Sequence, residues 1–258
     1  MLWVQVAFVA AVAAAAPAPA EKRWGGDHGG HWWATPSQTS DYIDFGKRWR
    51  SRDAVNGVCD LSKAQMPVAP TPLPSPAAGL SLSHVALGRG TQNYTCDLSN
   101  STAIPVAAGA LATLFNVSCI AADLPDLLSK LSPIALDLPV PASSDKSSPV
   151  YNSMSGRHYF TDLTTAFFNL DTELHPSWGQ GSFKKANASA APADATKGQF
   201  GKGDGTVPWL KLNAKMGAVN QYQEVYRLNT AGGQPPKTCK GLPASFEVQY
   251  SAEYWLWK

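Results

Sequence analysis

The chain has 258 residues, 16% of them charged, and a formal net charge of +2 at pH 7. This charge is too close to neutral for a protein that binds nucleic acid or an anionic membrane mainly through electrostatics. The length favours one sizeable domain or two small ones. The aromatic content of 10% is typical of β-structure and also of surfaces that contact carbohydrate.

An apolar, alanine-rich run at residues 4–16 is followed by small residues up to position 20. The run is shorter than the ~20 apolar residues that a membrane span requires. No basic residue precedes it, which is unusual for an export signal, and a buried N-terminal helix is the alternative. We interpret 1–20 as a signal peptide. We therefore expect a secreted protein, extracellular or in the cell wall, with no membrane span.

A glycine-dense segment follows, between the dibasic pairs Lys22-Arg23 and Lys47-Arg48. Ordering so many glycines is entropically costly, so we interpret 21–54 as a propeptide or disordered arm. Its histidines could chelate a metal, but loose His/Gly tracts usually bind metals adventitiously, and we predict no metal site. The remaining segment, 55–258, is expected to form one β-rich domain.

Four glycosylation sequons and four cysteines fit an exported chain. We expect glycans on surface asparagines. The even cysteine count predicts two disulfides, with three possible connectivities, and the lack of a Cys-x-x-Cys pair argues against a zinc knuckle or a redox site. The sequon asparagines are Asn93, Asn100, Asn116 and Asn187, and the cysteines are Cys59, Cys96, Cys119 and Cys239.

The first half of the domain mixes extended segments with one helix. Five prolines in 66–76 predict an extended strap along the surface of the core. Residues 80–86 and 92–96 alternate like successive strands, and 105–119 could form a strand or a short helix. Residues 122–131 favour a helix that Asp123 could cap, with Pro125 in its first turn.

The second half of the domain is expected to be mostly strands. Strand patterns begin at 156–160 and continue through 166–170, whereas 184–205 is expected to be a long exposed loop. The last predicted strands are 207–212, 224–228 and 246–257. Together these patterns predict a mainly β single domain, a sandwich or a barrel with one or two short helices and long loops.

Six short segments occur in an order that resembles a secreted domain of unknown function, found in bacteria and filamentous ascomycetes. They are 90–96, 156–159, 207–210, 226–233, 235–239 and 250–254, so the resemblance covers roughly residues 60–258. The family carries no established activity, although fungal members are often labelled malate dehydrogenase. Bacterial relatives have counterparts of Cys96 and Cys239, which implies that these two pair and leaves Cys59 with Cys119.

The residues do not support the dehydrogenase label. A dinucleotide site requires a glycine-rich turn between a strand and a helix N-terminus. Gly88-Arg89-Gly90 leads into a strand-like segment, and the glycines of 201–205 lead to Pro208. We therefore expect no nicotinamide cofactor, and the sequence predicts no other cofactor.

Catalytic signals are weak throughout the domain. The nearest approach to a Gly-x-Ser-x-Gly elbow, at 179–182, has the wrong register, although a dispersed Ser-His-Asp triad remains open. His158 and Asp162 would share one face of a strand and could join His175 as metal ligands, but three ligands at loose spacing are a weak signal. Carboxylates for glycoside cleavage could come from Asp162, Asp171, Glu173, Glu224 or Glu253, as in any β-rich secreted protein.

Aromatic and ionisable side chains of the domain could together line a ligand cleft, although packing in the core and at its rim is the better supported interpretation of the aromatic ones. The candidate residues are Tyr94, His158, Tyr159, Asp162, His175, Trp178 and Trp209. The sequence favours a non-catalytic binding or wall-associated protein, with carbohydrate or another wall component as its partner. The alternative is a secreted hydrolase acting on cell-wall or host polysaccharide. The sequence does not indicate an oligomeric state.

Overall fold

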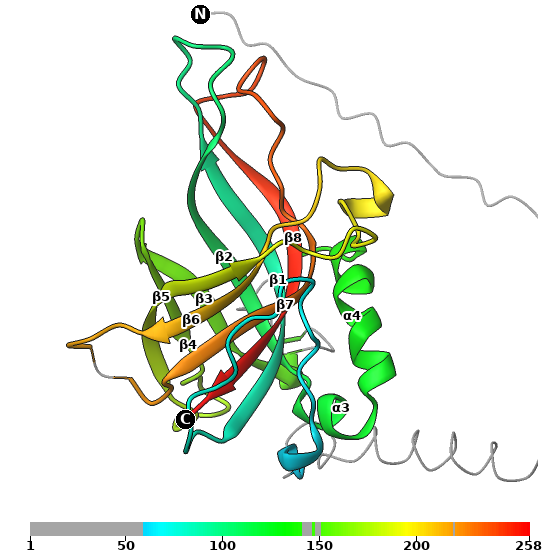
Figure 1. Cartoon of the computed structure of the whole chain (residues 1–258), viewed down its shortest axis with the longest axis vertical. Coiled ribbons are helices and arrows are strands. Elements are labelled where there is room, and N and C mark those ends of the chain that lie inside the picture. The colour runs from blue at the N-terminus through cyan, green and yellow to red at the C-terminus, as the bar shows by residue number, and fades with distance from the viewer. Residues whose placement is uncertain (1–58, 141–145, 148–150, 219) are drawn as a thin grey trace, which may run out of the picture. The chain divides into compact units, whose positions relative to one another are not determined.

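The computed structural model describes residues 59–258 except 141–145, 148–150 and 219. Eight antiparallel strands form a closed barrel, in which each strand pairs with its neighbours in sequence and β1 pairs with β8 (Figure 1). The strands are β1 (Leu82–Thr95), β2 (Val106–Asn116), β3 (Met154–Asp162), β4 (Thr165–Asn169), β5 (Gln180–Ser189), β6 (Trp209–Ala214), β7 (Glu224–Gly232) and β8 (Ser245–Trp257). The mainly β prediction is confirmed, and the barrel, not the sandwich, is the architecture. The expectations for 1–20 and 21–54 lie outside the described residues.

Glycines of β1 make the closed barrel possible. A Cβ at Gly90 would lie 1.8 Å from the carbonyl oxygen of Leu111 on β2, and one at Gly88 would lie 2.5 Å from the ring of Tyr254. Real Cβ atoms do not approach other atoms this closely. The glycines therefore let β2 and a lumen tyrosine pack directly against the β1 backbone.

Side chains fill the lumen of the barrel, as expected for eight strands, whose interior is just wide enough for them. The largest are aromatic: Phe168 lies edge-on to Phe183 and to Tyr254, with ring centroids 5.7 Å and 5.2 Å apart. The lumen core consists of Ala86, Ala110, Ala112, Leu114, Ala166, Phe168, Leu170, Phe183, Leu212, Tyr222, Val225, Tyr250, Ala252, Tyr254 and Leu256.

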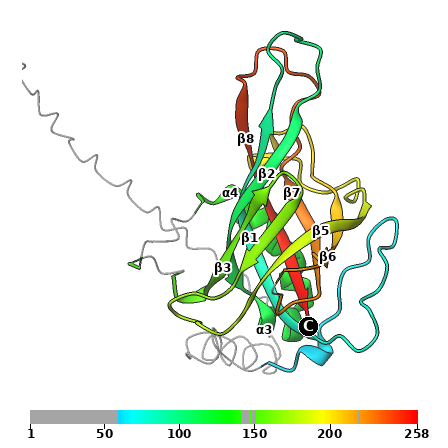
Figure 2. The same ribbon diagram turned by 90° about the vertical axis from the view of Figure 1, so that its left-hand side faces the viewer.

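A second core lies outside the barrel, where two helices cover β1, β7 and β8 (Figures 1 and 2). The helices are α3 (Ser118–Asp123) and α4 (Pro125–Asp137), and Pro125 occupies the first turn of α4 as predicted. Asp123 ends α3 and does not cap α4, whose N-cap is Leu124 with no side-chain cap bond. No helix in the described part of the chain is long and apolar enough to cross a membrane.

The proline-rich segment runs along the barrel as the predicted strap. The hydroxyl of Tyr226 donates to the carbonyl of Pro74 at 2.7 Å, and the ammonium of Lys211 donates to the carbonyl of Ser75 at 2.8 Å. Lys211 also pairs with Glu224 at 2.9 Å, and both side chains are buried. Proline supplies no N–H, so the outer side chains of β6 and β7 hold the strap through its carbonyls.

Two predictions are wrong in their extent. The single strand β1 (Leu82–Thr95) runs through both of the segments that were predicted as successive strands, without a break. The predicted loop at 184–205 begins too early, because β5 continues to Ser189. Its residues 184–188 are exposed, and three of them (Lys184, Lys185 and Asn187) are polar, yet backbone bonds to β6 keep this segment in the sheet. The composition of residues 184–188 therefore suggested a loop, although this segment is a solvent-exposed part of β5.

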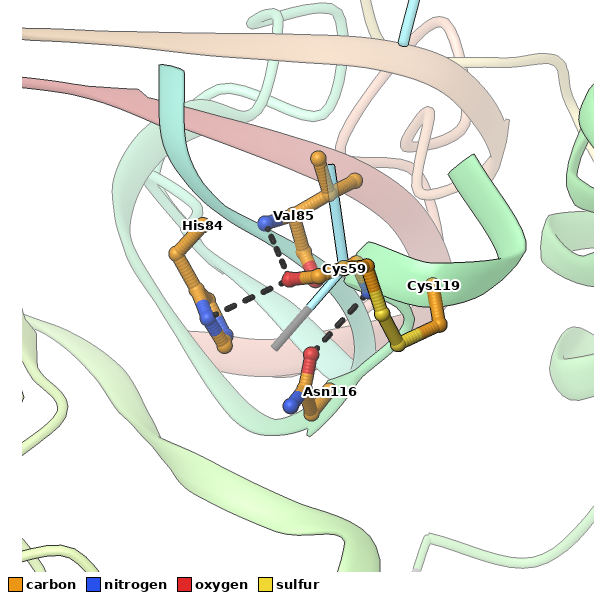
Figure 3. Close-up of a disulfide and its surroundings, with 6 residues drawn as sticks. Cys59, His84, Val85, Asn116 and Cys119 are labelled. Carbon is orange, nitrogen blue, oxygen red and sulfur yellow. Dashed lines mark hydrogen bonds between the residues drawn. A yellow bond between two sulfur atoms is a disulfide. The ribbon is translucent and has the colours of Figure 1, made fainter. Parts of the chain in front are cut away.

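Both disulfides have the pairing that the resemblance implied. Cys96 bonds to Cys239 with a Cα–Cα distance of 5.6 Å, and Cys59 bonds to Cys119 with a Cα–Cα distance of 5.3 Å. The first joins the end of β1 to the segment before β8. The second joins the start of the strap to α3 (Figure 3).

Replacing Cys96 and Cys239 together by serine should lower the free energy of unfolding by about 2–5 kcal/mol, because the link closes a long loop in the unfolded chain. Urea unfolding under non-reducing conditions measures the change. Met216→Ala, at a side chain that is 92% exposed, is the matched surface control and should leave the midpoint unchanged. Equal midpoints for the double variant and the control would contradict this account.

Candidate functional site

A pocket of about 550 Å³ lies on the outer side of β3, next to β4. Arg157 and Tyr159 project into it from β3, opposite in strand alternation to His158, which faces the lumen. Asn169 and Asp171 line it from the end of β4 and the segment that follows. The pocket is completed by Lys146, Tyr151, Met154, Gly156, Thr172 and Glu173.

The close approach of β3 to β4 shapes this pocket. Gly156 has φ +150°, and a Cβ there would lie 2.1 Å from the carbonyl oxygen of Asn169. Only glycine therefore lets the two backbones meet at this point. The register then sets Arg157 opposite Asn169 and Tyr159 opposite Phe167, with the two rings 5.2 Å apart.

Hydrogen bonds and one ion pair position the charged side chains of the pocket. Asp171 accepts the Gly179 N–H at 2.6 Å through Oδ1, and its own N–H donates to Asn169 Oδ1 at 2.9 Å. At the rim, Lys146 pairs with Glu173, which raises the pKa of Lys146. Both rim side chains are largely exposed, so their pair contributes little to stability. The pocket thus offers donors and acceptors of both charges beside two tyrosine rings.

The seven residues predicted for a ligand cleft lie in several places. Two face the lumen: the Tyr94 hydroxyl donates to the carbonyl of Gly233 at 2.7 Å, and the His158 ring stacks on Phe168 at 4.2 Å. Burial raises the pKa of Tyr94 to about 12 and lowers that of His158 to about 4. Tyr159 lines the β3–β4 pocket.

Asp162 and Trp209 lie away from both of these places. Asp162 ends β3, where hydrogen bonds from the Thr165 hydroxyl and from Thr164 hold the pKa of its carboxyl well below the usual range. It also lies 3.5 Å from Lys215. Trp209 is 3% exposed and belongs to the outer core. No group of three potential metal ligands occurs among the described residues, so the His158–Asp162–His175 combination is not assembled.

His175 and Trp178, in the segment between β4 and β5, stack face to face with ring centroids 3.5 Å apart. Burial lowers the pKa of His175. The ring centroid of His84 on β1 lies 4.9 Å from that of Trp178, and His84 Nδ1 lies 3.4 Å from the Ser118 hydroxyl oxygen. Figure 3 shows His84 and Val85 beside the Cys59–Cys119 disulfide.

This serine–histidine contact does not form a catalytic site. Ser118 is 8% exposed, and its hydroxyl accepts the Val85 N–H at 3.0 Å. The second ring nitrogen of His84, Nε2, has no hydrogen-bond partner, so no carboxylate orients the imidazole. Burial lowers the pKa of His84 to about 3, which leaves it neutral and unsuited to proton transfer near pH 7.

The sequence interpretation missed the pocket residues Arg157, Tyr151 and Asn169 as binding candidates. A usable signal existed for the first of them. Because strand side chains alternate, Arg157 and Tyr159 had to share the face opposite His158. Tyr151 lies in a short 3-10 helix (Tyr151–Ser153) directly before β3, and nothing in the sequence placed it next to that face.

A carboxyl with a raised pKa lies elsewhere in the fold. Glu253 on β8 is fully buried, and burial raises its pKa to about 7. Its two oxygens accept from the Asn229 amide at 2.7 Å and from the Trp255 indole at 3.0 Å. It does not line the β3–β4 pocket, and its burial makes its charged form costly.

The comparisons with known proteins identify a family. The model of a family described as "Protein of unknown function (DUF3455)" matches residues 76–258, which include all eight strands of the barrel. No curated protein and no solved structure matches the chain. The family description agrees with the predicted domain of unknown function and assigns no activity.

Glu253 should make stability fall as the pH rises. Its pKa is about 7 in the folded protein against an ordinary 4.5, so the native state binds the extra proton between these values. Raising the pH through this window should remove about 3 kcal/mol of stability, which the charge-neutral Glu253→Gln variant would keep. Urea unfolding from pH 4.5 to 8 measures both proteins. Since His84 and His158 are present in both, the difference isolates Glu253, and parallel pH profiles would contradict the assignment.

Proposed function

We propose that the chain, which belongs to the DUF3455 family, is a secreted, glycosylated binding protein without catalytic activity. The β3–β4 pocket is its binding site, and a carbohydrate of the cell wall is its ligand. Export is supported by the apolar run at 4–16, by the sequons and by the two disulfides, which are typical of oxidising compartments.

The observation that carries the proposal is the composition of the pocket. Tyr151 and Tyr159 provide aromatic surface on which the apolar face of a sugar ring can pack. Arg157, Asn169 and Asp171 provide hydrogen-bond donors and acceptors for sugar hydroxyls. A large apolar ligand would leave these polar groups desolvated and unpaired, so the chemistry favours a polar ligand with hydroxyl groups.

The pocket favours binding over hydrolysis. A glycosidase requires one carboxyl that donates a proton to the leaving group and a second that acts as nucleophile or base. The two carboxylates of the pocket already have partners: Asp171 accepts from Gly179, and Glu173 pairs with Lys146. Glu253 has the raised pKa of a general acid but is fully buried outside the pocket. The hydrolase therefore remains the second candidate.

The fold also argues against the dehydrogenase label that the resemblance brought into consideration. Dinucleotides bind at the carboxyl ends of parallel strands, next to a helix N-terminus. Every strand pairing of this barrel is antiparallel. We propose that the protein does not oxidise malate.

Tyr159→Ala should weaken binding of a β-linked wall oligosaccharide by about tenfold, equivalent to about 1.4 kcal/mol, because it removes the stacking surface. Calorimetry with glucose and N-acetylglucosamine hexasaccharides measures the affinity. Phe200→Ala, at an aromatic side chain that is 73% exposed elsewhere, is the matched control. Binding that is absent, or equal in the two variants, would disprove the proposed site.

The same hexasaccharides test the hydrolase alternative. The wild-type protein should release no new reducing ends during prolonged incubation, because the pocket carboxylates are held by other partners. Release that disappears in Asp171→Asn would establish the hydrolase and replace the binding proposal.

Asn100→Gln and Asn187→Gln should each remove one N-glycan when the protein is produced in a secreting eukaryotic host. Both asparagines are exposed and lie in sequons. Mass spectrometry with and without enzymatic deglycosylation measures the change. Asn152→Gln, at an exposed asparagine outside any sequon, is the control. A mass that changes only by the substitution would refute glycosylation at that position.

A further inference from the structure

Arg227 on β7 is a buried cation that faces the barrel lumen. Val225 belongs to the lumen core, whereas Tyr226 and Leu228 belong to the outer core. Strand alternation therefore points Arg227 inward, with Val225. The residue is 9% exposed and lies opposite Tyr254 on β8 and Leu210 on β6.

The charge of Arg227 has no counter-charge among the described residues. None of their ion pairs involves Arg227. One guanidinium nitrogen, Nη2, donates to the carbonyl of Pro208 at 2.9 Å, while Nε is buried without any hydrogen-bond partner. Arginine does not lose its proton in proteins, so it cannot avoid this cost by becoming neutral. A buried guanidinium that lacks a counter-charge and one hydrogen bond is costly, and a ligand that supplies a negatively charged acceptor would remove this cost.

A second buried donor without a partner lies in the same part of the lumen. Gln92 on β1 is 8% exposed, and its Nε2 has no hydrogen-bond partner. Gln92 and Tyr250 both lie against Gly233, where an added Cβ would be 3.1 Å and 3.0 Å from them. The Tyr250 hydroxyl shares a hydrogen bond of 2.9 Å with that of Tyr254, the residue opposite Arg227. The side chains of Gln92 and Arg227 interact with the hydroxyls of Tyr250 and Tyr254, respectively, so two buried donor groups flank one pair of tyrosines without a charged acceptor.

A pocket lined mostly by small or apolar residues lies next to Pro208, the hydrogen-bond partner of Arg227. Its volume is about 350 Å³, and Pro208, whose carbonyl holds Arg227, is one of its lining residues. Thr206, another lining residue, forms an isolated bridge with Gly233, the glycine against which Gln92 and Tyr250 pack. Most of the other lining residues are small or apolar: Ala190, Ala191, Pro192, Ala193, Ala195, Lys197, Gly205, Thr206 and Gln234.

We propose that this end of the barrel is a second ligand site, for a small carboxylic acid with an apolar body. The carboxylate binds the guanidinium of Arg227 and the amide nitrogen of Gln92, and takes the place of the Pro208 carbonyl as the acceptor of Nη2. The apolar body occupies the alanine-lined pocket. A carboxylate matches this site because it accepts two or more hydrogen bonds and neutralises the buried charge. The site is separate from the β3–β4 pocket and does not depend on the saccharide proposal.

Thermal unfolding at constant ionic strength tests the proposal, with hexanoate and benzoate as probes. Both should raise Tm saturably, by about 3 °C at ten times the dissociation constant. Hexanamide and benzamide, which lack the charge, should not. Chloride and acetate, which lack the apolar body, should act only at much higher concentration. Equal shifts for acids and amides, or no shift with either acid, would overturn the proposal.

Variants test whether the Tm shift arises from ligand binding at the lumen residues. Arg227→Met keeps the length of the side chain without its charge and should abolish the Tm shift. Gln92→Leu, a separate variant that retains Arg227, should reduce the shift at least severalfold. Arg157→Gln, at the exposed arginine of the β3–β4 pocket, is the matched control and should respond like the wild type. A full response in Gln92→Leu and Arg227→Met would overturn the proposal, as would its loss in Arg157→Gln.

Discussion

The limited volume inside an eight-stranded barrel is the constraint on which the rest of this structure depends. Several aromatic rings share the lumen, and they fit because the neighbouring strands β1 and β2 contribute glycine and alanine. Tyr254 packs where a Cβ at Gly88 would lie 2.5 Å from its ring, and Ala110 and Ala112 of β2 also belong to the lumen core. The filled lumen makes the barrel a rigid scaffold and leaves its outer faces and its ends for function.

The outer faces are used differently around the barrel. The helices cover β1, β7 and β8, the strap is held by side chains of β6 and β7, and residues of both contribute to the second core. On β3 and β4, the exposed Arg157 and the half-buried Tyr159 border a pocket instead. Gly156 connects the packing of the strands with the formation of the pocket. The close backbone contact that it permits between β3 and β4 also brings Asn169 and Asp171 to the pocket. Fold and site therefore depend on the same small residues.

Much of the fold could be predicted because its signals are local. The alternation in β8 and the prolines of the strap each indicated the correct structure. The pairing of Cys96 with Cys239 came from the family resemblance. The end of β5 was missed because its residues are polar on a solvated face, and their strand bonds come from β6, which is distant in sequence. Asp123 was taken for a cap although it belongs to the preceding helix.

The site was less predictable because the closed barrel decides which residues meet. His158 and Tyr159 are adjacent in sequence, yet one faces the lumen and the other the outer pocket. Arg227 lies in 226–233, one of the segments that carry the family resemblance. Only the closed barrel shows that its charge is buried with no carboxylate paired to it among the described residues. Inward and outward faces follow from alternation once a strand is known. Which strands are neighbours follows only from closure.

The central claim is that the filled barrel binds a wall saccharide on the outer side of β3 and β4. Backbone amide shifts recorded by NMR during a titration with the hexasaccharides test it most directly. The account predicts shifts concentrated at 154–159 and 169–173, with inward-facing residues such as Phe183 and Leu212 unchanged. Shifts centred on the lumen residues, or no shifts at saturating saccharide, would contradict it.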